Sequence, residues 1–127
     1  MNPFIWISIG AGGAIGAMAR HGVSQIAFRL LGPHFPWGTL AVNVVGSVAM
    51  GMLIVWLARH EPQHVALRAF LTVGLLGAFT TFSAFSLDTV TLYKDRSLSI
   101  AAIYLTASVV LSVGGLVGGM LAARATS

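Results

Sequence analysis

A stretch near the middle of the chain carries residue types suited to ion chemistry inside a membrane. Residues 74–86 read GLLGAFTTFSAFS. Glycine and β-branched threonine both weaken a helix, so we expect a break here that frees backbone carbonyls to coordinate a small cation. Beyond the break, Phe82 and Phe85 share one helix face, with the hydroxyls of Thr81 and Ser83 nearby. The positive edges of such rings can face an anion, although packing is the commoner role of phenylalanine in a membrane helix.

A second set of polar residues lies in the preceding apolar run. Thr39, Asn43 and Ser47 recur every four residues and therefore share one helix face. Asn43 carries the only side-chain amide in that run. An asparagine in a membrane helix commonly bonds a neighbouring helix, which is worth about 1 kcal/mol, and its NH₂ group can alternatively donate to an anion. Taken alone, this pattern favours the interhelical bond.

The last apolar run repeats the spacing with hydroxyl groups. Tyr104, Ser108 and Ser112 are four residues apart and form a ladder about 12 Å long, because a helix rises about 1.5 Å per residue. A single serine in a helix often donates to the carbonyl four residues earlier. A continuous ladder instead offers a track of donors along which an anion can pass.

The first apolar run contains one unusual charge. Arg20 follows Gly16 by four residues and Gly12 by eight, so the three share one helix face. An arginine at mid-span costs about 2.5–3.5 kcal/mol on insertion scales and is a functional candidate. Its side chain either extends to the nearer interface or faces a vestibule, where it attracts anions or stabilises the structure. The sequence leaves these roles open.

The elements that must position these residues are membrane helices. Of the 127 residues, 8% are charged and 57% hydrophobic, with a mean hydropathy of +0.89, whereas a soluble domain carries about 25% charged residues. A helix needs about 20 apolar residues to cross a bilayer. We therefore predict an all-α membrane protein with one domain, residues 1–127, and four transmembrane helices. The expected spans are residues 4–31, 37–58, 65–93 and 98–123, with the break in the third.

Composition also excludes several classes of function. The chain has no cysteine, which excludes disulfides and thiolate metal sites. Its seven lysines and arginines are scattered, so the pI near 10.8 indicates loop charges at lipid headgroups rather than a nucleic-acid partner. Four histidines are present, and no nucleophile–base pair can be identified. We do not expect an enzyme.

The balance of cations bears on orientation. In an up-down-up-down arrangement, one side of the membrane holds Arg59, Arg68 and Arg124, and the other holds Arg29, Lys94 and Arg96. Orientation follows the excess of Lys and Arg on one side, and three against three gives no excess. Either finer details fix one topology, or the chain inserts both ways and pairs as an antiparallel homodimer. Glycines four residues apart in the first and last runs suit close helix contacts, within one subunit or between two.

Two segments together carry a family resemblance. The sequence GTLAVNVVG at residues 38–46, combined with residues 74–86, resembles the Fluc/CrcB family of fluoride channels. The length, the four spans and the arginine in the first helix are similar as well. The resemblance implies a channel that passively exports fluoride across the inner cell membrane, as an antiparallel dual-topology dimer with a central structural sodium ion.

The resemblance also implies roles for individual residues. The fluoride pathway would be lined by these residues: Asn43, Thr81, Phe82, Ser83, Phe85, Tyr104, Ser108 and Ser112. Backbone carbonyls of Gly77 and Thr80 from both subunits would hold the sodium ion. Asp88 stands where family members commonly have glutamate, which leaves the role of this carboxylate open.

Two other kinds of protein fit the composition. Small multidrug resistance exporters are also four-helix antiparallel dimers, but they need a carboxylate in the first helix, and the first run here has none. A non-transporting membrane anchor subunit would explain the helices, but it would not explain the weakened third run or the hydroxyl ladder.

Overall fold

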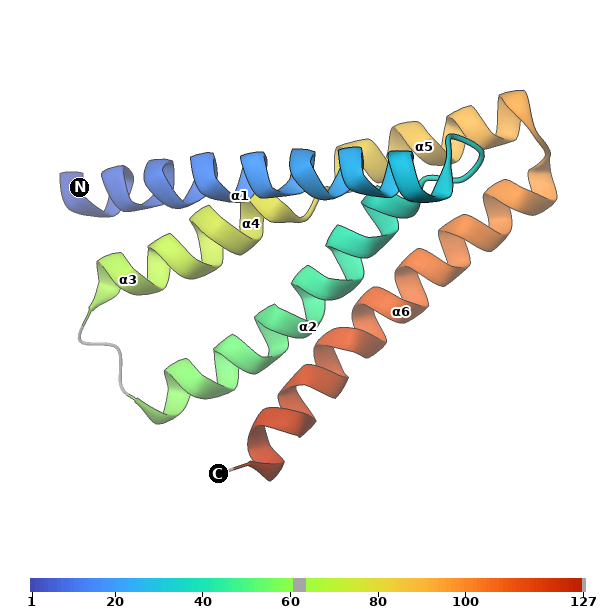
Figure 1. Ribbon diagram of the computed structural model, residues 1–127. Helices are drawn as coiled ribbons and strands as arrows, with labels where there is room; N and C mark the ends of the chain where they lie inside the picture. The colour runs from blue at the N-terminus through green and yellow to red at the C-terminus, as the bar shows by residue number, and fades with distance from the viewer. Residues whose placement is uncertain (61–63, 127) are drawn as a thin grey trace.

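The computed structural model describes residues 1–60 and 64–126, and within this part of the chain it contains helices and no strand (Figure 1). In chain order the helices are α1 (Pro3–Leu31), α2 (Trp37–Arg59), α3 (Val65–Ala69), the π-helix η1 (Phe70–Leu76), α4 (Gly77–Phe79), α5 (Phe82–Asp95) and α6 (Leu98–Ala125). The all-α class is confirmed. The outer helix ends lie within two residues of the four predicted runs.

Three helical segments are long and apolar enough to cross a membrane. They are Trp37–Arg59, Val65–Asp95 and Leu98–Ala125. Helix α1 is long enough, with 29 residues, but it is not among the three. It is less hydrophobic because it contains five glycines and, in its second half, Arg20, His21 and Arg29.

Local sequence signals explain where the helices begin and end. Asn2 caps α1 through a bond from the Phe4 N–H to its side chain (3.0 Å), and Ser97 caps α6 in the same way through the Ile100 N–H (3.1 Å). At the other end of α1, Gly32 has a φ of 82°, which glycine adopts without steric cost. The glycine therefore lets the chain turn sharply toward α2.

Helix α1 packs against the third helical segment through glycines. A Cβ atom added to Gly12 would meet the Phe70 carbonyl, and one added to Gly16 would meet the Leu75 carbonyl. The backbone of η1 therefore lies directly against α1, an approach that only residues without a side chain permit. The small-residue face predicted for the first run is used within one subunit.

Helices α2 and α6 form the other close pair and run side by side in the same direction (Figure 1). Gly51 faces the Leu116 carbonyl, and Gly119 faces the Val48 carbonyl. At their shared C-terminal end, the Arg59 guanidinium donates to the carbonyls of Ala123 (2.9 Å) and Arg124 (3.3 Å). These bonds satisfy carbonyls that the end of α6 leaves without helical partners.

The third segment is irregular where the sequence predicts a weakened helix. It changes from α to π geometry over Phe70–Leu76, returns to α geometry for Gly77–Phe79, and stops. Thr80 (φ −84°, ψ 159°) and Thr81 (φ −152°, ψ 125°) have extended backbones. Helix α5 then starts at Phe82, so two residues separate two helical pieces.

Candidate functional site

The extended residues at the break are held by a side chain from α2. The Thr81 N–H donates to Asn43 Oδ1 (2.7 Å), and Asn43 Nδ2 donates to the Thr81 carbonyl (2.9 Å). Asn43 thereby supplies the backbone with a donor and an acceptor that the interrupted helix cannot supply. It joins α2 to the third segment, and its second amide hydrogen remains available.

These bonds leave two carbonyls of the break without their helical donors. In a continuous helix the Thr81 N–H would bond the Gly77 carbonyl and the Ala84 N–H would bond the Thr80 carbonyl. The Thr81 N–H donates to Asn43 instead, and the Ala84 N–H donates to Thr81 Oγ1 (3.1 Å). The break therefore frees the carbonyls of the same two residues, Gly77 and Thr80, that the resemblance singles out.

A cavity of about 450 Å³ lies beside the break, between α2, α5 and α6. It brings together residues from three separate parts of the sequence. Its polar and aromatic lining consists of Asn43, Ser47, Thr80, Thr81, Phe82, Phe85, Ser108 and Ser112. Six of the eight predicted pathway residues therefore meet in one place, and the other two, Ser83 and Tyr104, do not line it.

The two phenylalanines lie next to each other at the start of α5. Their ring centroids are 5.5 Å apart and the ring planes are inclined by 58°. Phe85 is 7% exposed, whereas Phe82 is 77% exposed on the surface of the single chain. One ring is thus fixed by packing, and the other stands at the open side of the cavity.

Two hydroxyl groups from α6 line the cavity and have no partner among the described residues. The Oγ atoms of Ser108 and Ser112 are buried, and no described residue forms a hydrogen bond with them. Buried hydroxyls normally have a hydrogen-bond partner. Neither serine donates to the carbonyl four residues earlier in its own helix. Both hydroxyls are therefore free to donate to a ligand.

Tyr104 has a different position from the two serines. It is 0% exposed, and its hydroxyl donates to Asp88 Oδ2 (3.2 Å). Its ring contacts Phe85 (centroids 5.5 Å apart) and lies nearly perpendicular to Phe35 (centroids 5.4 Å apart, planes at 88°). Tyr104 therefore connects the cavity-lining Phe85 with a separate group of residues around Asp88.

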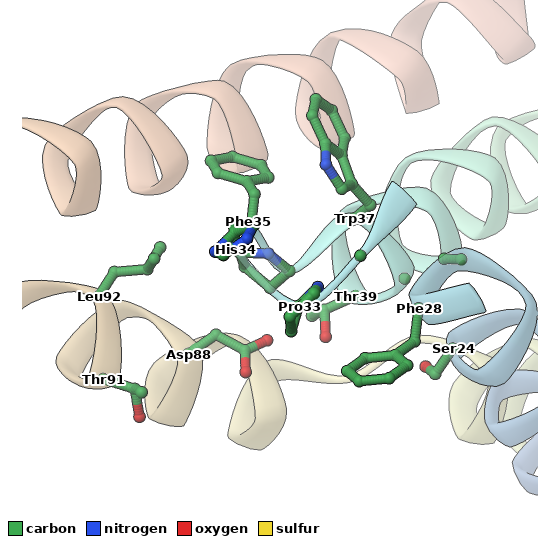
Figure 2. A pocket seen from close by; sticks show the side chains of 14 residues that line it. Ser24, Phe28, Pro33, His34, Phe35, Trp37, Thr39, Asp88, Thr91 and Leu92 are labelled. Carbon is green, nitrogen blue, oxygen red and sulfur yellow. The ribbon is translucent and has the colours of Figure 1, made fainter. Parts of the chain in front are cut away.

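That separate group surrounds a smaller cavity of about 250 Å³ near the turn between α1 and α2. Figure 2 shows its lining: Asp88 from α5, Thr39 from α2, and His34 and Phe35 from the turn. The predicted polar stripe of α2 is thus divided. Thr39 lines the smaller cavity, whereas Asn43 and Ser47 line the larger one.

The remaining predicted residues, Ser83 and Arg20, lie outside both cavities. The Ser83 hydroxyl is 3.3 Å from Thr81 Oγ1, at the start of α5. Arg20 is half-buried in α1 and lines neither cavity.

Sequence reasoning assigned no role to Gly46, although it lies within one of the two segments that carry the resemblance. A Cβ at Gly46 would meet the Thr80 methyl group, and Phe79 lies at 3.2 Å. A glycine one turn from Asn43 was the available signal that α2 approaches the break closely.

The chain is similar over most of its length to proteins of one known family. The family model described as "CrcB-like protein, Camphor Resistance (CrcB)" matches residues 7–120. A "Fluoride-specific ion channel FluC" of Agrobacterium fabrum is 46% identical over 116 residues, which cover 91% of this chain and 93% of the relative. One of Cereibacter sphaeroides with the same description is 52% identical over 118 residues, or 93% of each chain. The protein thus belongs to the CrcB family.

Proposed function

We propose that this protein is a fluoride-selective ion channel that passively exports fluoride across the cell membrane and so lowers its toxicity in the cytoplasm. It is a multi-pass membrane protein and not an enzyme. The observation that carries the proposal is the larger cavity beside the helix break. There the Asn43 amide, two aromatic rings and two hydroxyls that no described residue bonds come together. Relatives that share about half of its residues are described as fluoride-specific ion channels.

The chemistry of the cavity suits a small, strongly hydrated anion. Fluoride enters a membrane only if protein groups replace its water shell. Ser108 and Ser112 are able to donate hydroxyl hydrogens and Asn43 an amide hydrogen, whereas the rings of Phe82 and Phe85 present weakly positive edges. Binding by such groups is favourable enough for entry and weak enough for release, which conduction requires.

The active form in this proposal is an antiparallel dual-topology homodimer in which α1 is a fourth membrane span. Phe82, a pathway residue, is 77% exposed on the single chain, so a second copy is needed to enclose it. Gly114 and Gly118 have open space where a Cβ would stand and offer an unused small-residue face. Arg59 and Arg124 lie at the C-terminal ends of α2 and α6 and Arg68 lies in α3, whereas Arg29, Lys94 and Arg96 lie at the C-terminal ends of α1 and α5.

Dual topology can be tested with one cysteine, because the native chain has none. We expect Thr126→Cys to be labelled by impermeant reagents from both sides of the membrane in comparable amounts. Labelling from only one side would contradict the antiparallel dimer. It would not bear on fluoride conduction, which the flux measurement tests separately.

A structural sodium ion is part of the same proposal. In a continuous helix the N–H groups of Thr81 and Ala84 would bond the carbonyls of Gly77 and Thr80, but here they donate to Asn43 and to Thr81 Oγ1. The two carbonyls are therefore free, and such hard oxygen ligands suit a sodium ion. When bound, the ion would be held by these carbonyls from both subunits and would neutralise their dipoles. Arg20, half-buried in α1, is proposed as a vestibule or structural charge.

Ion flux tests the function directly. Purified protein in liposomes should release fluoride at least 100-fold faster than chloride, and the release should need no proton gradient. Equal release of the two anions would refute selectivity. A requirement for proton exchange would favour a coupled exporter, and a lack of any flux would favour a membrane anchor subunit.

A further inference from the structure

We propose that Phe35, in the turn between α1 and α2, is a positioning residue for ion conduction: it fixes the ring of Tyr104 and, through that ring, the orientation of Phe85. This inference rests on the proposed function. Phe35 lines the smaller cavity and not the larger one, so its effect on conduction is transmitted by other side chains.

The orientation of Phe85 matters because an aromatic ring has a positive edge and a negative face. A ring that turns its edge toward an anion attracts it, whereas a ring that turns its face repels it. Phe85 lines the larger cavity and is 7% exposed. Its neighbour Phe82 is largely exposed on the single chain and offers no fixed support. The orientation of Phe85 is therefore set by its buried neighbours.

Tyr104 is the buried aromatic neighbour of Phe85. Their ring centroids are 5.5 Å apart and the ring planes are inclined by 45°. Both rings belong to one buried cluster with Leu92 and Ala101. The cluster lies between α5 and α6, and α5 packs more extensively against α6 than against any other described helix. Movement of the Tyr104 ring therefore changes the surface on which Phe85 rests.

Tyr104 is held at its polar end and at its ring. Its hydroxyl donates to Asp88 Oδ2 (3.2 Å), but a bond at one end leaves the ring able to swing about that end. Phe35 packs nearly perpendicular to this ring, an arrangement that aromatic pairs prefer. Leu40 and Ile100 also pack against the cluster, but aliphatic side chains impose little preference on the angle of a ring. The angle of the Tyr104 ring therefore depends on Phe35.

The turn holds Phe35 in place. Pro33 and Pro36 restrict the backbone of the turn, and the Trp37 N–H donates to the Phe35 carbonyl (2.8 Å). The rings of Phe35 and Trp37 lie 4.6 Å apart, on the same side of the smaller cavity (Figure 2). Four successive ring contacts thus connect Trp37 at the turn with Phe82 at the larger cavity.

Removal of the Phe35 ring tests the proposal. Phe35→Leu keeps an apolar side chain without the ring, and Phe35→Tyr keeps the ring. Each variant is purified as folded channel and reconstituted in liposomes, and fluoride release is measured with an electrode. We expect Phe35→Leu to conduct about fivefold more slowly, which corresponds to about 1 kcal/mol, and Phe35→Tyr to conduct normally. Phe28→Leu is the matched control, because Phe28 lines the same cavity and takes part in none of the described ring contacts; its flux should be unchanged.

A second measurement shows whether Phe35 acts through Tyr104. In a Tyr104→Leu channel the series of ring contacts is already interrupted, so adding Phe35→Leu should lower the flux no further. A second fivefold loss would mean that Phe35 acts by another route and would overturn the proposal. If Tyr104→Leu gives no folded or conducting protein, the comparison of Phe35→Leu with Phe35→Tyr and Phe28→Leu decides alone.

The remaining outcomes are also decisive. Normal flux through Phe35→Leu, or equal losses in Phe35→Leu and Phe35→Tyr or in Phe35→Leu and Phe28→Leu, would overturn the positioning role. Failure of Phe35→Leu to fold would assign Phe35 to stability alone and would overturn it as well. Absence of flux through the unmodified protein would refute the proposed function instead.

Discussion

Replacing Asn43 by alanine should destabilise the break as well as reduce conduction. The substitution removes two hydrogen bonds, of 2.7 and 2.9 Å, and leaves the Thr81 N–H and carbonyl without partners. Thr81 is 8% exposed, and each buried backbone group left unpaired costs about 1–3 kcal/mol. We therefore expect a loss of about 2–6 kcal/mol, which is a large share of the stability of a protein fold.

Stability and flux must be measured on the same preparations to separate the two effects. Thermal unfolding in detergent reports the effect on stability, measured as the fraction of protein that still elutes as folded channel after heating. Fluoride release from liposomes reports the functional part. Ser47→Ala is the matched control, because Ser47 lies one turn further on the same face of α2 and lines the same cavity; we expect its stability to be nearly unchanged.

The two measurements together decide what Asn43 does. An Asn43→Ala channel as stable as Ser47→Ala would refute the argument that the asparagine holds the backbone of the break. Loss of flux with full stability would mean that its amide serves only the ion. Full stability together with normal flux would remove Asn43 from the site altogether.

Three further predictions follow from the same contacts. Gly16→Ala should destabilise the protein by about 1–3 kcal/mol in thermal unfolding, because the added Cβ would overlap the Leu75 carbonyl. The control Gly13→Ala has open space around its Cβ and should be neutral or slightly stabilising. Equal effects of the two substitutions would refute the close packing of α1 against η1. Phe82→Ile and Phe85→Ile should each lower fluoride flux more than tenfold in folded channels, a loss of over about 1.4 kcal/mol. Phe4→Ile, at the exposed start of α1, should leave the flux unchanged. Normal flux through the Phe82 and Phe85 variants would assign these rings to packing. Replacing sodium by a large organic cation should lower both the melting temperature and the flux, and indifference of both would exclude a structural sodium ion.

Much of the helical framework could be predicted because it depends on local signals. The uncharged run from Trp37 onward and the turn at Gly32 and Pro33 indicate a helix and its boundary without any knowledge of neighbours. The weakened helix in residues 74–86 was also local, since glycine and threonine oppose helix formation. Sequence did not predict that η1 would adopt π geometry, in a segment whose backbone packs closely against Gly12 and Gly16 of α1.

The partners within the site depend on how helices are placed against one another, which spacing does not reveal. Equal spacing made Tyr104, Ser108 and Ser112 equivalent in the sequence. In the fold, the Tyr104 hydroxyl donates to Asp88 whereas the serine hydroxyls have no described partner. Thr39 and Asn43 also share a face of α2, yet they border different cavities. Periodicity gives the face, and the neighbouring helix decides what each residue on that face contacts.

The break leaves backbone groups without helical partners over very few residues. Stopping a helix frees carbonyls on one side, and starting the next frees N–H groups on the other. At Thr80 and Thr81 both ends occur within two residues, and a cation is proposed at the carbonyls of Gly77 and Thr80. Asn43 bonds only Thr81, between the two ends, and leaves those two carbonyls free. A neutral amide is donor and acceptor at once, so it stabilises the backbone of the break without competing for the cation.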